Sequence, residues 1–322
     1  MKRLTLTALL FATLMFTACG RSESESTESQ DNATVSSQTR SYTDAADREL
    51  SIPVSPKRII ALSEVDLDAM LAVGVKPIAA TDGRGQKGFP RYLDVAKTQG
   101  ITSVGHLGNP SMEALLIAKP DMILLGGFYT DQALEKLSAI APVVVTYTLK
   151  EDWKKGFERV AALLEKQDAY DTFMAQYDQK IQQVRKSIGE HINDTVSIIR
   201  WNPKGPMFMY NTVFASKVIE DIGLKRPEYQ DKGGAPHSPI LSLESLDQLD
   251  GDWIFMGTLM TQGDAVSAMA SATSTPAFKA LKGVQKGHLI PVDGSMWTSV
   301  GGPLAAMQVL DDVQKAMSQA DE

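Results

Sequence analysis

One pattern of residues occurs twice in this chain, at residues 111–125 and again at residues 242–256. Each copy has a serine two residues before a glutamate, an apolar residue between them, and an aspartate eight residues after the glutamate. The serine can cap a short helix, Pro or Gly then breaks the helix, and an apolar run of strand length follows. A helix that leads into a strand buried on both faces is typical of an α/β sheet. The repeated pattern therefore predicts two similar α/β lobes with mostly parallel central sheets.

A long helix is expected between the two copies, over residues 168–188. Its apolar residues recur at helical spacing, and they are Phe173, Tyr177, Ile181, Val184 and Ile188. At 1.5 Å per residue the helix would be roughly 30 Å long, enough to cross a small domain. We expect Asp168 to cap its start and Gly189 to end it. Such a helix usually packs on one core, but the pattern repeated on both sides of it favours a connector between two lobes.

Residues 1–18 have the features of a secretory signal peptide, with two basic residues, an apolar stretch and small residues before Cys19. The sequence from Phe16 to Gly20 resembles a bacterial lipobox, in which the cysteine is acylated, although Phe16 stands where leucine is usual. An unlipidated signal peptide or a short membrane helix is the alternative. Because Cys19 is the single cysteine, we expect no internal disulfide.

The composition changes after the signal peptide. Residues 19–47 contain mostly Ser, Thr, Glu, Gln and Asn, which predicts a lipidated cysteine followed by a disordered tether. The rest of the chain exceeds what one hydrophobic core usually supports. We therefore expect an N-terminal α/β lobe at residues 48–150, a helical connector at 151–189 and a C-terminal α/β lobe at 190–322.

Several predicted strands end in cations or aromatic residues. Ligands of open α/β sheets bind at the carboxyl ends of the strands, and a glycine-rich loop at residues 81–90 follows one such strand. The candidate residues at these ends are Arg84, Phe128, Tyr129, Arg200, Trp201, Tyr210 and Trp297. Taken singly, each is commonly a core, rim or solvated residue. As a set they suit an anionic, partly planar small molecule.

Signatures of several other functions are absent from the sequence. There is no G-x-S-x-G, H-E-x-x-H or C-x-x-C motif, and no G-x-G-x-x-G at a strand-to-helix turn. The histidines (His106, His191, His237 and His288) form no i, i+4 pair, so we expect no protein metal site. The formal net charge of −7 and the lack of a basic run argue against a nucleic-acid partner. We expect no enzymatic activity and no intrinsic cofactor.

Two sets of segments resemble bacterial ABC-transporter substrate-binding proteins for ferric siderophores. The segments similar to the N-terminal lobe of that family are Phe89–Leu93, Gly100–Gly105 and Ser111–Asp121. Those similar to the C-terminal lobe are Arg200–Trp201, Phe214–Ser216, Glu220–Pro227, Leu241–Glu244 and Trp297–Ala306. The Trp-Thr-Ser sequence that begins the last segment resembles iron-siderophore and ferric-citrate members, whereas the Pro-Asp patterns are shared with cobalamin and haem relatives.

The resemblance implies a class III periplasmic binding protein, with two α/β lobes joined by one long helix and a ferric siderophore in the cleft between them. Because siderophore oxygens already saturate the Fe(III), the protein needs no metal ligand of its own. The resemblance implies that Arg84 and Arg200 pair with ligand oxygens. It also implies that Trp201, Tyr210 and Trp297 form walls of the site.

The family also uses one glutamate on each lobe to meet arginines of the permease, and the repeated pattern places these at Glu113 and Glu244. The simpler alternative is that each acid complements the dipole of its own helix, worth about 0.3 to 1 kcal/mol. The partners implied are an ABC permease, its ATPase subunits and a membrane reached through the lipid anchor. We expect a monomer held at the outer face of the cytoplasmic membrane or in the periplasm.

Two alternatives are left open. The same fold could carry haem or cobalamin, and haem would need an axial ligand such as Tyr129 or Tyr210. Residues 206–210 contain no cation where some relatives have one, which argues against a highly charged ligand. A surface hydrolase or adhesin on an α/β scaffold is the other alternative, and a hydrolase would require Ser, His and an acid to meet in the cleft.

Overall fold

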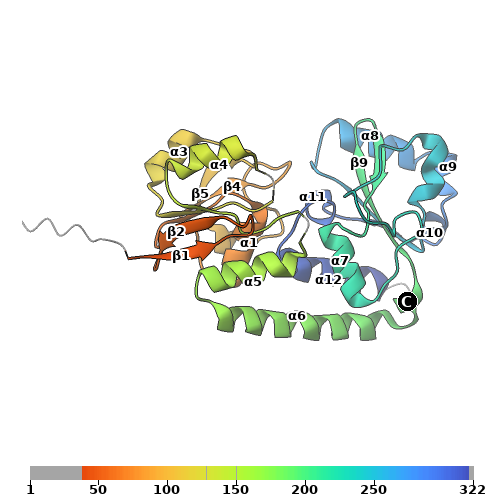
Figure 1. Ribbon diagram of the computed structural model, residues 1–322. Helices are drawn as coiled ribbons and strands as arrows, with labels where there is room; N and C mark the ends of the chain where they lie inside the picture. Colours follow the sequence, from red (N-terminus) through yellow and green to blue (C-terminus); the bar gives the residue numbers. More distant parts are fainter. Residues whose placement is uncertain (1–37, 128, 150, 319–322) are drawn as a thin grey trace, which may run out of the picture. The chain divides into compact units, whose positions relative to one another are not determined.

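A buried apolar run, Ile59–Ala61, forms a central strand of a six-stranded sheet, part of which is labelled in Figure 1. The computed structural model of the chain describes residues 38–127, 129–149 and 151–318. The sheet has the order β6-β5-β4-β3-β7-β8, and its strands are parallel except for β6 at one edge. Its strands are β3 (Ile59–Ala61), β4 (Ala79–Asp82), β5 (Thr102–His106), β6 (Asn109–Pro110), β7 (Met122–Leu124) and β8 (Val143–Val144).

Serine caps begin two helices of this first half, and the repeated pattern predicts the one at Ser111. The Ser63 hydroxyl accepts a hydrogen bond from the Asp66 N–H at 3.1 Å, and the Ser111 hydroxyl accepts one from the Ala114 N–H at 3.2 Å. Both caps satisfy N–H groups that a helix leaves without partners. The helices of this half are α1 (Glu64–Ala72), α2 (Val95–Thr98), α3 (Met112–Ala118) and α4 (Asp131–Ser138).

A four-stranded sheet organises the second half, with the order β10-β9-β11-β12. Three of its strands are parallel, and β10 pairs antiparallel with β9. The strands are β9 (Val196–Asn202), β10 (Gly205–Phe208), β11 (Trp253–Thr258) and β12 (Leu289–Pro291). The helices are α7 (Phe214–Ile222), the 3₁₀ helix η2 (Leu243–Leu249), α8 (Asp264–Thr273), α9 (Pro276–Lys279), α10 (Lys282–Gln285), α11 (Gly294–Trp297) and α12 (Pro303–Met317).

The repeated pattern leads into a buried parallel strand in both halves. In the first half α3 precedes β7, and in the second η2 precedes β11. The two copies differ in their caps, because the Ser242 side chain makes no capping hydrogen bond to η2. The predicted serine cap is therefore present in one copy only.

The long helix is α6 (Gln167–Ile188), which follows α5 (Trp153–Leu163) and precedes the short 3₁₀ helix η1 (Gly189–Asn193). The residues predicted for its apolar face are those that the structure buries: Phe173, Tyr177, Ile181, Val184 and Ile188. The helix packs against α5, α7 and α12 (Figure 1). The predicted cap is wrong, because the helix begins after Lys166 with no side-chain cap and Asp168 lies in its first turn.

The largest cluster of buried apolar side chains draws on both halves. It joins α1 and β3 of the first half to α6 and to α7, β9 and α12 of the second. Two smaller clusters lie within single halves, one around β7 and β8 and the other around β9, β11 and α9. The two sheets therefore share a core along α6 and α12.

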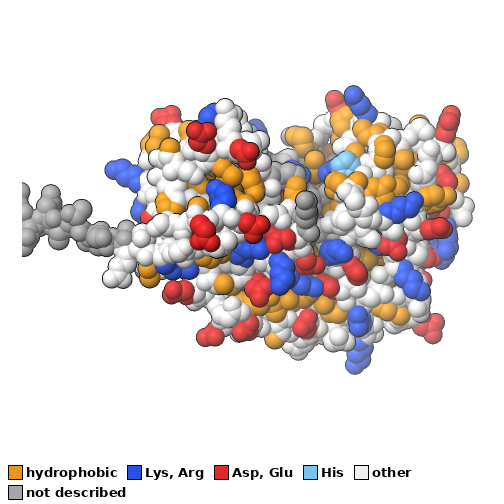
Figure 2. All heavy atoms as spheres, viewed as in Figure 1, with side chains coloured by type: hydrophobic (Ala, Val, Ile, Leu, Met, Phe, Trp, Pro, Cys, Tyr) orange, Lys and Arg blue, Asp and Glu red, His pale blue; other side chains and the backbone are white. Residues whose placement is uncertain are grey.

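A hairpin of β1 (Thr39–Thr43) and β2 (Glu49–Pro53) precedes the six-stranded sheet. Its first strand lies inside the segment 19–47 for which a disordered tether is expected, so regular structure begins before residue 48. The expected signal peptide and Cys19 lie outside the described residues. Among the described residues, no helix is both long and apolar enough to cross a membrane. Figure 2 shows acidic and basic side chains interspersed over the face that it draws.

Candidate ligand-binding site

Arg84 lies in the glycine-rich loop that follows the buried strand β4. Its backbone N–H donates a hydrogen bond to Oε1 of Glu64, the first residue of α1, at 2.6 Å. The loop borders a cavity of about 360 Å³ lined by Gly83, Arg84, Gly85, His106, Leu107 and Gly108. Burial lowers the pKa of the half-buried Arg84, while the charge of Glu64 acts in the opposite direction. A guanidinium thus lies at the carboxyl end of a parallel strand, where α/β sheets bind ligands.

Arg200 lies on β9 in the second half and is 9% exposed. Its Nη1 donates to the backbone oxygen of Thr298 at 3.2 Å, and its Nη2 contacts the weak acceptor Sδ of Met207 at 3.1 Å. Its Nε has no hydrogen-bond partner among the described residues. Burial lowers the pKa of Arg200, and the charge of Arg84 lowers it further. The two guanidinium groups therefore repel each other, and an anion between them would relieve that repulsion.

Loops from the two halves contact each other beside Arg84. Nη2 and Nε of Arg91 donate to the Asp293 carboxylate at 2.6 and 3.0 Å, and Nη2 also donates to Oγ of Ser295 at 3.2 Å. Nε2 of Gln86 donates to the same Ser295 oxygen at 2.9 Å. A Cβ atom at Gly85 would lie 2.9 Å from the backbone oxygen of Leu259, so this contact needs glycine. The loop that holds Arg84 is thereby fixed against the second half.

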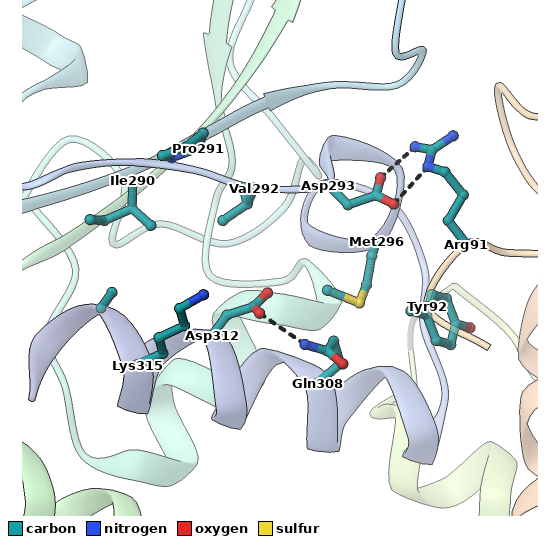
Figure 3. Close-up of a pocket in the computed structure, with 11 residues that line it drawn as sticks. Arg91, Tyr92, Ile290, Pro291, Val292, Asp293, Met296, Gln308, Asp312 and Lys315 are labelled. Atoms are coloured by element: carbon teal, nitrogen blue, oxygen red, sulfur yellow. Dashed lines mark hydrogen bonds and ion pairs between the residues drawn. The ribbon is translucent and has the colours of Figure 1, made fainter. Parts of the chain in front are cut away.

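A larger cavity of about 770 Å³ lies beside β12 and α12, and Figure 3 shows the side chains that line it. Both of its carboxylates have hydrogen-bond partners. Asp293 faces Arg91, and Asp312 on α12 accepts hydrogen bonds from Nε2 of Gln308 at 2.9 Å and Nε1 of Trp297 at 2.8 Å. Of the predicted ligand residues that the structure describes, none lines this cavity. The smaller cavity at Arg84 is the better candidate for an anionic ligand.

The two tryptophans predicted as walls of the site are both buried, and their role in ligand binding stays a prediction. Trp201 is 2% exposed and packs edge-on against Phe278 with ring centroids 6.2 Å apart. Trp297 is fully buried and stacks on Phe255 at 4.6 Å. Their rings fill the core of the second half, so neither presents a surface to a ligand in this structure.

The predicted tyrosines lie in two different environments. Tyr210 is half-buried after β10 and packs edge-on against Phe208, with centroids 5.3 Å apart, and its role stays a prediction. Tyr129 packs with the cluster around β7 and β8, where burial raises its pKa and where the charges of Asp44 and Arg48 act on it. The role of Tyr129 in ligand binding stays a prediction. Phe128 lies outside the described residues.

The predicted docking glutamates are both exposed. Glu113 lies in the first turn of α3, and Glu244 lies in the first turn of η2. Apolar side chains are exposed beside them: Met112, Leu116 and Ile117 near Glu113, and Ile240 and Leu243 near Glu244. Each half thus has an exposed glutamate beside exposed apolar residues. This arrangement is compatible with docking to a permease, and also with each glutamate interacting only with the dipole of its own helix.

Sequence reasoning missed several polar residues near Arg84, namely Glu64, Gln86, Arg91, Asp293 and Ser295. Glu64 follows a serine that can cap a helix, and Asp293 follows the apolar run at residues 289–292, so the position of each in the sequence could have indicated it. Asp293 also caps α11 by accepting a hydrogen bond from the Ser295 N–H at 2.9 Å. The pairing of Arg91 with Asp293 joins residues far apart in the chain, and no local pattern indicates it.

The periplasmic binding protein family model matches residues 59–295, which is most of the described chain. This chain belongs to the periplasmic binding protein family. The family and the α/β fold class predicted from the sequence are confirmed. Across the described ranges, no group of three or more His, Cys, Asp or Glu side chains is placed to hold a metal ion.

This periplasmic binding protein is similar to several relatives over nearly its full length. It is 31% identical over 315 residues to the probable siderophore-binding lipoprotein YfiY of Bacillus subtilis, covering 95% of this chain and 94% of that one. It is 27% identical over 323 residues to the iron-uptake system-binding protein of the same organism, covering 96% and 99%. Its fold is similar to that of Staphylococcus aureus SirA complexed with staphyloferrin B, with a TM-score of 0.74, 23% identity, and 86% and 98% of the two chains covered.

Proposed function

We propose that this protein is the solute-binding component of an ABC importer and that it captures a ferric siderophore of hydroxamate or citrate type. The observation that carries the proposal is the pair Arg84 and Arg200. They come from different halves of the chain, each is at least partly buried, and the charge of Arg84 acts on Arg200. Relatives whose names state siderophore binding or iron uptake support the choice of ligand.

The protein's part in this proposal is recognition, with no chemical step. The siderophore oxygens hold the iron, and the two guanidinium groups donate charge-assisted hydrogen bonds to ligand oxygens. Nε of Arg200, which lacks a partner among the described residues, supplies one such donor. Tyr210 contributes ring surface at the margin of the site. No catalytic group is needed for this function.

Calorimetric titration of the full chain tests the ligand class. The titrants are ferric trihydroxamates, ferric citrate, ferric tricatecholates, haem and cobalamin. We expect saturable binding below micromolar concentration by a ferric trihydroxamate or by ferric citrate, and no heat from haem or cobalamin. Binding of haem with a Soret shift, and of no ferric siderophore, would contradict the proposal.

Delivery to the permease is the second part of the proposal. The protein is exported, held at the outer face of the membrane by a lipid on Cys19, and acts as a monomer. Glu113 and Glu244 then meet arginines of the permease, and the exposed apolar residues beside them complete each contact. The lipoprotein name of the YfiY relative supports the anchor.

Reversing both charges, Glu113→Lys with Glu244→Lys, tests docking. Iron uptake by cells is expected to fall to the level of cells lacking the protein, because like charges then face each other. The affinity of the purified chain for its ferric ligand should be unchanged. A matched control is Glu135→Lys on α4, which makes the same charge change at another exposed site and should leave uptake intact. Uptake by the double variant at the wild-type rate would remove both glutamates from the interface.

A further inference from the structure

Glu64 is a buried acid beside the arginine that the proposed function uses. It is 4% exposed at the start of α1, and its Oε1 accepts the backbone N–H of Arg84 at 2.6 Å. Its second oxygen, Oε2, is buried and has no hydrogen-bond partner among the described residues. A buried carboxylate oxygen normally has a partner, so one left without any indicates a group that awaits a ligand or a proton.

We propose that Glu64 is a specificity-determining residue that sets the net charge of the ligand site and thereby the charge of the ferric complex that the site accepts. The inference rests on the proposed function and deepens it. Arg84 and Arg200 bring two positive charges to the site, and the Glu64 carboxylate offsets one of them. The ionised site therefore favours complexes of low negative charge.

The other charged groups around Glu64 shift its pKa in opposite directions, since Arg84 and Arg91 lower it and Asp293 raises it. They are Arg84, Arg91 and Asp293, all of which act on its titration, and Arg91 and Asp293 pair with each other. The partly buried Tyr92 donates its hydroxyl hydrogen to Asp68, which lies on the same helix as Glu64, at 2.9 Å. Burial raises the pKa of Glu64 to about 7, so its charge changes between pH 6 and pH 8.

Protonation of Glu64 changes the site without disturbing the loop. Oε1 continues to accept the Arg84 N–H, while a proton on Oε2 removes the negative charge and creates a hydrogen-bond donor. The site then keeps the positive charges of Arg84 and Arg200 but loses the negative charge of Glu64. Anionic ferric complexes should bind more tightly at pH 6 than at pH 8, and neutral complexes should not.

A charge series on one ligand skeleton tests this inference. The probe is a linear ferric trihydroxamate whose end group is a free amine, an acetylated amine or a succinylated amine, which makes the complex cationic, neutral or anionic. With Glu64→Gln at pH 8 we expect the anionic member to bind about tenfold more tightly, the cationic member about tenfold more weakly, and the neutral member within twofold of wild type. Gln keeps an oxygen for the Arg84 N–H.

The pH dependence of the wild-type chain is a second measurement that needs no variant. Its preference for the anionic over the neutral member should rise about tenfold from pH 8 to pH 6, and this rise should be absent in Glu64→Gln. The control Glu135→Gln, the same change at an exposed residue, should behave as wild type.

Three outcomes would overturn the inference in different ways. Equal changes in affinity for all three complexes in Glu64→Gln would mean that Glu64 affects binding only by positioning the loop that holds Arg84, and not by its charge. A charge preference that neither Glu64→Gln nor pH alters would mean that Glu64 does not contribute to it. A wild-type chain that binds none of the three complexes would overturn the proposed hydroxamate ligand itself, and the inference with it.

Discussion

Arg200 and Trp201 are consecutive residues on β9, and the structure gives them opposite environments. Successive side chains of a strand point to opposite faces of the sheet, so the two cannot both face one site. Arg200 approaches Thr298 and feels the charge of Arg84, whereas Trp201 packs on Phe278 in the core. This alternation can be read from the sequence alone, and it favours Arg200 over Trp201 as a ligand residue.

Substitutions at these two neighbours should therefore affect different properties: ligand binding for Arg200 and stability for Trp201. Arg200→Ala is expected to weaken binding of the ferric ligand by about 1.5 to 3 kcal/mol, the range for a hydrogen bond to a charged group. Trp201→Phe should leave binding within twofold but lower the free energy of unfolding by about 1 to 3 kcal/mol, because it removes packing volume. Nε1 of Trp201 makes no hydrogen bond among the described residues, so no polar partner is lost.

Calorimetry and urea unfolding of both variants check this pair of outcomes. Weaker binding by Trp201→Phe at unchanged stability would return Trp201 to the site. Unaltered binding by Arg200→Ala would remove Arg200 from it.

At the level of elements, the sequence predicted helix faces and strands well because these depend on residues close in the chain. The buried face of α6 and the buried strands β7 and β11 follow from spacing and from apolar runs. The acids Glu64, Asp66 and Asp68 of α1 were not expected to be buried, since acids usually mark a solvated face. Their partners lie in distant segments, such as the Leu304 N–H that donates to Asp68 at 2.7 Å.

The prediction that Gly189 ends the long helix can be tested by substitution. Gly189 has φ +53° and ψ −123°, a backbone conformation that side chains with a Cβ atom rarely adopt. Gly189→Ala should lower the free energy of unfolding by about 1 to 3 kcal/mol through backbone strain, although no other atom lies near the new methyl group. Urea unfolding measures the loss.

The matched control for Gly189→Ala is Gln183→Ala, which places the same side chain at an exposed position inside α6. It should change stability by less than about 0.5 kcal/mol. Equal stability of the two variants would show that α6 ends without strain at Gly189.

At the level of the whole molecule, the two halves are joined by α6 and by polar contacts of charged side chains, of which Asp68 is buried. Asp68 on α1 accepts the N–H groups of Leu304 and Ala305, at 2.7 and 3.0 Å, and so caps α12 from the other half. Arg91 and Asp293 form an ion pair across the same boundary. Stability should therefore depend on the charge state of buried acids as much as on apolar packing.

Two sets of carboxyl groups make stability depend on pH in opposite directions. Burial raises the pKa of Glu64 to about 7 and the pKa values of Asp66 and Asp68 to about 6. Burial acts the same way on Asp252, but hydrogen bonds from two lysines and a threonine outweigh it and hold its pKa well below the ordinary value. The first set binds protons more readily in the folded chain, and Asp252 binds them more readily in the unfolded chain.

The sign of each contribution fixes the shape of the stability curve. As pH falls from 8 through the raised pKa values of Glu64, Asp66 and Asp68, the folded chain takes up protons first and becomes more stable, until the unfolded carboxyls also protonate near pH 4. Below that, the ion-paired Asp252 loses its contribution.

We expect the midpoint of thermal unfolding to be roughly 5 °C higher at pH 5.5 than at pH 8, and to fall again below pH 4. In Glu64→Gln the rise between pH 8 and pH 6 should be smaller. Scanning calorimetry at fixed ionic strength measures both chains, and a midpoint that increases steadily from pH 5 to pH 8 would contradict the burial of these acids.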